Sequence, residues 1–211
     1  VKLNYALALT YLKQYEKAYK LATELSENEQ YFGGSQMGAL GIRAFIDIEE
    51  GSEIEIGSLK ISSFQFNHPI INLGYRVEDA NNSLVFTGDH EWMSNDLTED
   101  DGAWEERQRE VDFRRTETFN FIRQSDILII DTAYTDEEYK TKKGWGHGTF
   151  DSSIAAGLEA NCKQIYFTHH EPRRTDKALE TAFRHALKKN KIPKNQTRFY
   201  LAQEGYEVDV R

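Results

Sequence analysis

The chain has 211 residues and a net charge of −9, with an apolar fraction of 39% and a charged fraction of 29%. This length and composition are typical of about one soluble globular domain with a sizeable core. The acidic balance argues against a broad nucleic-acid-binding face, and no apolar run approaches the ~18 residues of a membrane span. Because Cys162 is the single cysteine, no internal disulfide can form, and we expect a reducing, cytoplasmic location.

Residues 1–30 predict a short helical hairpin, with apolar side chains at helical spacing on both sides of a break near Gln14. The segment LALTYLKQYEKAYKLATELSE resembles one tetratricopeptide hairpin, which cannot bury its apolar face alone. Since no second copy follows, we favour an ordinary amphipathic hairpin that packs on the remainder, residues 31–211.

The next part of the chain predicts strands. After a glycine-rich loop, three short runs alternate apolar and polar residues, with turns near Gly51 and Gly57. A hairpin follows, in which the turn-rich segment EDANN separates two apolar runs. The predicted strands are residues 42–48, 52–57, 59–66, 73–77 and 83–88.

The second half alternates helices and strands. The polar segment EWMSNDLTEDDG predicts an exposed loop, ILIID and QIYFT are typical of buried strands, and Asp151 is a candidate helix cap. The C-terminal residues predict a hairpin around Glu204 and Gly205. The predicted helices are residues 103–124, 152–160 and 175–189. Together the two halves predict a sheet-rich α/β protein.

Histidines and aspartates gather at the predicted strand ends or in the loops just beyond them. Strand ends meet at one edge of an open α/β sheet, and imidazoles with carboxylates are the ligand set of zinc, manganese or iron. Burial of an unpaired charge is costly, so buried Asp and His side chains need partners. One shared site would provide these partners together. The candidate residues are His68, Asp89, His90, Asp131, His147 and His169.

These motifs resemble those of the metallo-β-lactamase fold, in the branch of ribonuclease Z and related phosphodiesterases. The resemblance rests on HPxxxxGYRVE followed by VFTGD, on ILIIDTAYTDEEY followed by GWGHGTFDSSIAAGLEA, on FTHH, and on the closing LAQEGYEVDV. It covers about residues 38–211 and excludes residues 1–30. The resemblance implies an αββα sandwich, of which residues 31–211 form the C-terminal portion.

One family motif is absent. The first metal motif, His-x-His-x-Asp-His, does not occur in this sequence. Either the chain is truncated at its N-terminus, the alternative that we favour, or it is a degenerate member in which the helical hairpin replaces the first half. We expect weak metal binding and impaired activity in the chain alone, because each metal would keep one histidine and a shared carboxylate.

The resemblance also implies roles for individual residues. His68 would bind one metal, His169 the other, and Asp89 would bridge them, while Asp131 would orient His147 toward the substrate phosphate or the leaving group. We predict that His169 and not His170 is the ligand, because strand side chains alternate in direction and the ligand of the resembled motif is the histidine directly after threonine.

The implied reaction is hydrolysis of a phosphodiester by a metal-activated water at a dinuclear site. Zinc is the expected metal, with manganese or iron as alternatives, and the substrate would be a small phosphodiester or an RNA end. A homodimer is compatible with the sequence. The alternative is a non-catalytic protein-interaction role on a metal-free sheet domain.

Overall fold

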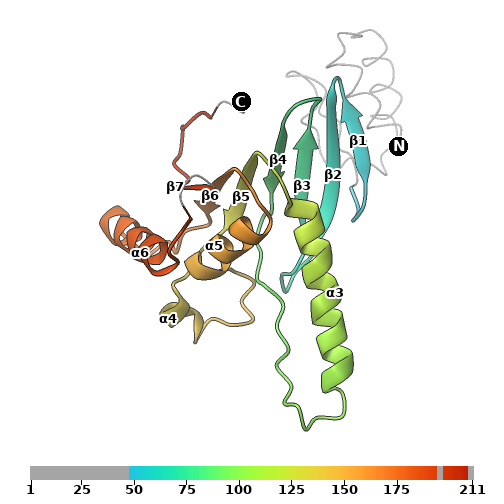
Figure 1. The fold of residues 1–211 in the computed structure, drawn as a ribbon, viewed down its shortest axis with the longest axis vertical. Helices are drawn as coiled ribbons and strands as arrows, with labels where there is room; N and C mark the ends of the chain where they lie inside the picture. The colour runs from blue at the N-terminus through green and yellow to red at the C-terminus, as the bar shows by residue number, and fades with distance from the viewer. Residues whose placement is uncertain (1–47, 194–196, 209–211) are drawn as a thin grey trace, which may run out of the picture.

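The computed structural model describes residues 48–193 and 197–208. The predicted helical hairpin of residues 1–30 lies outside them, as does all but the last residue of the predicted strand 42–48. The described residues form a seven-stranded mixed sheet, in which the strands follow one another in chain order (Figure 1).

The first four strands form an antiparallel meander. Their alternation of polar and apolar residues suits a sheet that is covered on one face. Gly57 adopts a positive φ of 62° in the turn between the first two strands, which a residue with a Cβ adopts less readily. The strands are β1 (Glu53–Ile56), β2 (Leu59–Phe66), β3 (Asn72–Glu78) and β4 (Ser83–Phe86).

The last three strands pair in parallel, and helices make the crossovers between them. The predicted change from a meander to strand–helix alternation is therefore confirmed, and with it the α/β class. The strands are β5 (Ile127–Asp131), β6 (Gln164–Thr168) and β7 (Arg198–Leu201). The helices are α3 (Trp104–Ile122), the short α4 (Asp136–Tyr139), α5 (Phe150–Glu159) and α6 (Asp176–Lys189).

Helices α3 and α5 pack on the same face of the sheet (Figure 1). Phe121 of α3 stacks on Phe64 of β2 with ring centroids 5.0 Å apart, and Phe150 of α5 meets Phe167 of β6 edge-on at 5.6 Å. Phe183 of α6 also reaches Phe167, at 5.7 Å. This apolar layer fixes the positions of the strand ends beyond it.

Two local expectations differ from the structure. Helix α5 is capped by Thr149 and not by Asp151: the amide of Ser152 donates to the Thr149 hydroxyl, and the Ser152 side chain binds back at the Thr149 amide. This reciprocal capping begins the helix two residues earlier than a cap at Asp151 would. The predicted C-terminal hairpin keeps its turn at Glu204 and Gly205, but the described residues after β7 form no strand.

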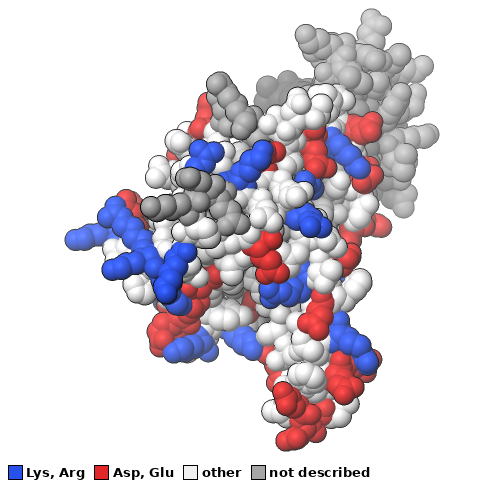
Figure 2. Space-filling view, viewed as in Figure 1, with Lys and Arg blue, Asp and Glu red and all other residues white. Residues whose placement is uncertain are grey.

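The surface mixes both charges on the face drawn in Figure 2. Acidic side chains gather around the beginning of α3, and basic side chains gather over α6. None of the helices within residues 48–193 and 197–208 has both the length and the apolar character needed to cross a membrane.

Replacement of Gly157 by alanine should destabilise the protein by about 1–3 kcal/mol, because a Cβ there would lie 1.7 Å from the Cδ1 atom of buried Ile165. Helix propensity alone would favour alanine by up to about 1 kcal/mol. A lower free energy of unfolding in the variant would therefore show that α5 approaches β6 closely. Urea unfolding measures the effect. Gly102→Ala is the control, since no atom lies within 4 Å of its added Cβ. Equal stability of the two variants would contradict this packing.

Candidate metal centre

Four strands deliver the candidate residues to one edge of the sheet. Strand β2 runs in the direction of β4, because β3 is antiparallel to both, and β4 is parallel to β5 and β6. Their carboxyl ends therefore meet at the same edge, where sites form in open α/β sheets. His68 follows β2, Asp89 follows β4, Asp131 ends β5 and His169 directly follows β6.

Asp89 lies between two of the predicted ligands. Its Oδ1 is 3.0 Å from His169 Nδ1, and its Oδ2 is 3.7 Å from His68 Nε2. The Asn72 side chain fixes the Asp89 backbone, because its Nδ2 donates to the Asp89 carbonyl at 2.7 Å. Gly88, with a φ of 62°, permits this turn, since a Cβ there would lie 2.5 Å from the Asn72 side-chain oxygen.

Asp131 and His147 form a second pair at the same edge. The Asp131 carboxylate is fully buried, and its Oδ2 lies 2.7 Å from His147 Nδ1 and accepts from the His90 amide at 3.1 Å. Burial raises the pKa of the Asp131 carboxyl, while the hydrogen bond to His147 acts against that shift. The same hydrogen bond raises the pKa of His147. The pair is therefore suited to hold a proton on His147 near neutral pH.

The two pairs come together as one cluster of ligand-type atoms. One side-chain atom from each of Asp89, Asp131, His147 and His169 lies within 4.8 Å of all the others. The rings of His147 and His169 stack with centroids 4.3 Å apart, and the His68 ring is 5.6 Å from that of His147. Within residues 48–193 and 197–208, the buried Asp131 Oδ1 has no hydrogen-bond partner. An unpaired buried carboxylate oxygen among imidazoles fits a cation, because a positive charge would offset its desolvation.

Hydrogen bonds orient two of the rings. The Nδ1 atom of His68 lies 3.0 Å from the carbonyl oxygen of Ile70, and that of His147 is bound to Asp131. Each ring therefore keeps Nε2 for another partner, which is the arrangement that carboxylates and carbonyls impose on metal-binding histidines.

His169 and His170 separate just after β6. His169 has a positive φ of 56°, an uncommon conformation for a residue with a Cβ, and its ring turns to Asp89. His170 lies outside the cluster. The structure thus brings His169 to the edge, through a backbone turn and not through strand alternation. Its role as a ligand stays a prediction.

The structure brings all five predicted site residues together. The division of roles among them stays a prediction, and His147, predicted to act on the substrate, lies in the same 4.8 Å group as Asp89 and His169. The expectation of an exposed loop from Glu91 onward is wrong at its start. Glu91 is 5% exposed and His90 is 2% exposed. Their position directly after Asp89 is the signal that could have indicated burial.

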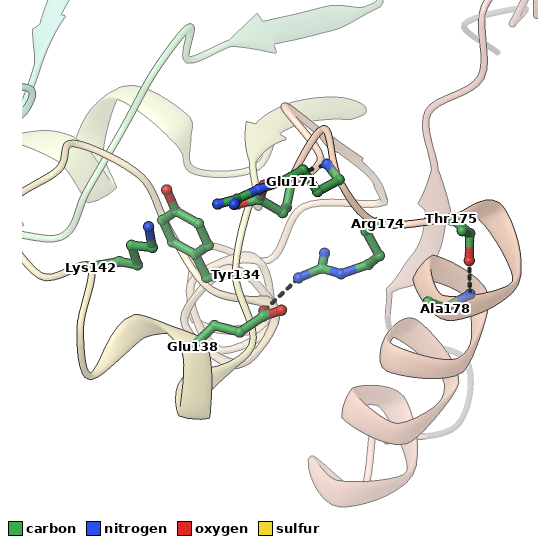
Figure 3. Close-up of a pocket in the computed structure, with 8 residues that line it drawn as sticks. Tyr134, Glu138, Lys142, Glu171, Arg174, Thr175 and Ala178 are labelled. Carbon is green, nitrogen blue, oxygen red and sulfur yellow. Dashed lines mark hydrogen bonds and ion pairs between the residues drawn. The ribbon is translucent and has the colours of Figure 1, made fainter.

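A cavity of about 470 Å³ lies beside Tyr134, and none of the cluster residues lines it (Figure 3). Tyr134 lines it, and its ring centroid is 6.1 Å from that of His147. Arg174 is held by the Ala133 carbonyl at 3.0 Å and by Glu138. Lys142 and Tyr134 both line this cavity (Figure 3). Among the described residues, no carboxylate pairs with Lys142, whose ammonium lies 3.7 Å from the centroid of the Trp145 ring.

The fold and the cluster together define an α/β protein with a carboxylate–imidazole centre at its strand ends. A comparison with models of protein families finds no match, and neither does a comparison with curated proteins. Solved structures do match. The metallo-β-lactamase fold protein YhfI from Bacillus subtilis is 14% identical with a TM-score of 0.54, over 76% of this chain and 52% of that chain.

The isothiocyanate hydrolase from Delia radicum gut bacteria is 12% identical with a TM-score of 0.51, over 81% of this chain and 62% of that chain. The short form of human tRNase Z (ELAC1) is 14% identical with a TM-score of 0.47, over 75% of this chain and 44% of that chain. The chain thus spans less than two thirds of each of these structures. Its described residues have the metallo-β-lactamase fold, as the sequence motifs predicted.

Replacement of His90 by phenylalanine should make folding less sensitive to acid. The ring lies edge-on to Phe66 and Trp92, and burial lowers the pKa of His90 to about 3. At pH values between about 3 and about 6.5, the imidazole of His90 binds a proton in the unfolded chain but not in the folded chain. The free energy of unfolding therefore falls with decreasing pH, by up to about 1.4 kcal/mol per unit from this group.

Urea unfolding of the chelator-treated chain between pH 6.5 and pH 4 measures this slope. His90→Phe should show the shallower fall, while the exposed His185 on α6 supplies the control variant His185→Gln, with the wild-type slope. Identical slopes in all three proteins would contradict a buried, neutral His90.

Proposed function

We propose that this chain carries the site of a metal-dependent hydrolase that acts on a phosphodiester. The observation that carries the proposal is the cluster of Asp89, Asp131, His147 and His169, whose ligand atoms lie within 4.8 Å of one another, with His68 beside Asp89. The fold likeness supports it, because the matched structures include a protein named as a hydrolase. Fold alone does not assign a reaction, so the proposal rests on the site.

His68, Asp89 and His169 are the proposed metal-holding residues. They contribute two imidazoles and one carboxylate, a donor set that suits zinc and also accepts manganese or iron. When bound, a divalent cation there would polarise a phosphoryl oxygen and lower the pKa of water. Asp89 is central to this arrangement, because its two oxygens face different histidines.

His147 is the proposed proton donor to the leaving group. Its Nδ1 is engaged by Asp131 at 2.7 Å, so Nε2 is the atom that can deliver a proton. The hydrogen bond that raises the pKa of His147 keeps the ring protonated at higher pH, which suits a general acid. Asp131 holds the ring in place and is itself held by the His90 amide.

The cavity beside Tyr134 is the proposed place for the anionic substrate. Lys142 supplies a positive charge that pairs with no carboxylate of the described residues, and Tyr134 also lines the cavity (Figure 3). The Arg174 guanidinium adds a second cation, partly offset by Glu138. These groups favour a phosphate ester, either a small phosphodiester or an RNA end, over a neutral ester.

Replacement of Asp89 by asparagine should weaken zinc binding at least about tenfold, because the amide removes the negative charge shared by His68 and His169. Isothermal titration of the chelator-treated chain with zinc measures this effect. Asp79→Asn removes an exposed carboxylate of the turn before β4 and serves as the control. Equal zinc affinity in the wild type and Asp89→Asn would contradict the assigned ligands.

Replacement of His147 by alanine should lower kcat on bis(p-nitrophenyl) phosphate by about 10²–10⁴-fold, while zinc content changes little, because a general acid contributes to turnover and not to metal binding. Turnover is measured with zinc or manganese supplied, and metal content is measured on the same samples. Loss of the metal with unchanged residual turnover would show that His147 is a ligand. A wild-type chain that binds no zinc and hydrolyses no phosphodiester or other ester would favour the non-catalytic alternative.

A further inference from the structure

Glu91 is a buried carboxylate that receives hydrogen bonds from three donors. The residue is 5% exposed, and its Oε1 accepts from the Tyr139 hydroxyl at 2.5 Å and from the Gly144 amide at 2.8 Å. Its Oε2 accepts from the Gly146 amide at 2.7 Å. Within the described part of the chain no Lys, Arg or His forms an ion pair with it. Burial of such a charge is tolerated because several donors solvate it.

The backbone of Glu91 is fastened to the exit of another strand. Its amide donates to the Asn67 carbonyl at 2.9 Å, and Asn67 Nδ2 donates back to the Glu91 carbonyl at 2.8 Å. Asn67 directly precedes His68, and Glu91 follows Asp89 by two positions. One residue therefore connects the segment after β2, the segment after β4 and the loop that contains Gly144 and Gly146.

That loop adopts a shape that requires its glycines. Gly144 and Gly146 have positive φ values of 82° and 93°, and Trp145 between them is 56% exposed. A Cβ on Gly146 would lie 2.1 Å from His68 Cδ2 and 2.6 Å from Pro69 Cδ. The Glu91 carboxylate thus holds the loop against the His68 segment, immediately before the residue that meets Asp131.

We propose that Glu91 is a positioning residue, whose carboxylate holds the Gly144 and Gly146 amides so that His147 reaches Asp131 and His169. It acts through the loop backbone and not on a substrate. The placement of His147 stands on the contacts above, while its consequence for turnover rests on the proposed function. If Glu91 had only a structural role, its replacement would change the free energy of unfolding and leave the position of the His147 ring unchanged.

Glu91→Gln tests the proposal in the full 211-residue chain without metal. Glutamine has the same shape but one acceptor oxygen, so its NH₂ group must face either Gly146 or the pair of Tyr139 and Gly144. At least one glycine amide then loses its acceptor. We expect its hydrogen exchange to become about tenfold faster or more. In the nitrogen–proton NMR spectrum of the histidine side chains, we expect His147 to lose the signature of an Nδ1 hydrogen bond to Asp131.

Two variants serve as controls. Glu137→Gln makes the same chemical change on an exposed residue of α4 and should leave the exchange rates and the His147 signals unchanged. Tyr139→Phe removes the phenol but keeps both amide acceptors, and should retain the His147 signature. If Glu91→Gln does not fold, Glu91→Asp repeats the measurement with the charge retained on a shorter side chain, which we expect to release a glycine amide.

The outcomes separate this inference from the proposed function. Unchanged His147 signals in a folded Glu91 variant would overturn the positioning role, whatever the activity. If the chain hydrolyses bis(p-nitrophenyl) phosphate with zinc, Glu91→Gln should lower kcat at least about tenfold with little change in KM, because proton donation and not substrate binding is disturbed. A wild-type chain without hydrolysis, but with the expected exchange and NMR changes in Glu91→Gln, would overturn the proposed function and keep the positioning role.

Discussion

The contact between the buried Asp131 carboxylate and His147 is the interaction on which the candidate site depends. A carboxylate with no solvent exposure at the end of β5 is costly unless its oxygens are paired. His147 and the His90 amide satisfy one oxygen, and the other has no hydrogen-bond partner among the described residues. The contact therefore fixes the loop that carries His147 and leaves one buried carboxylate oxygen of Asp131 unpaired among the described residues. A cation in the cluster would complete the balance of charge.

Polar anchors, more than apolar packing, hold the loops beyond the strand ends. Asn72 fixes the turn at Asp89, Glu91 holds the Gly144 and Gly146 amides, and Glu138 binds Arg174 beside the cavity. The apolar layer between α3, α5 and the sheet reaches these loops at Trp92, which stacks on Phe119 of α3. Hydrogen bonds to charged groups are directional, so they can fix the backbone of these loops beside the candidate site. A rigid core with specifically tethered loops is a suitable support for preorganised chemistry.

The fold is shared much more widely than the sequence. Structures that are 12–14% identical to this chain superpose on three quarters of it or more with TM-scores of 0.51–0.54. At that distance the likeness defines the arrangement of strands and helices, and one fold supports many reactions through changes at its edge. The substrate preference of this chain must therefore come from its own side chains. Under the proposed function, the cations Lys142 and Arg174 on the cavity wall would favour an anionic substrate over a neutral one.

The sequence by itself determined the strands and the positions of the candidate ligands along the chain. Period-two alternation marked the meander, continuous apolar runs marked β5 and β6, and His68, Asp89, Asp131 and His169 stood visibly at strand ends. These signals are local, because the alternation of apolar and polar residues that marks a strand extends over only a few neighbouring residues. The order of the motifs was sufficient to indicate the metallo-β-lactamase fold.

Only the tertiary structure decided which polar side chains are buried and what they hold. Glu91 belongs to a segment that looks like an exposed loop, yet its partners Tyr139, Gly144 and Gly146 lie about fifty positions away in sequence. His169 enters the site through a positive φ that no strand pattern predicts. Such contacts depend on how separate loops meet after the sheet has formed, and burial of a charge becomes favourable only when those distant donors are in place.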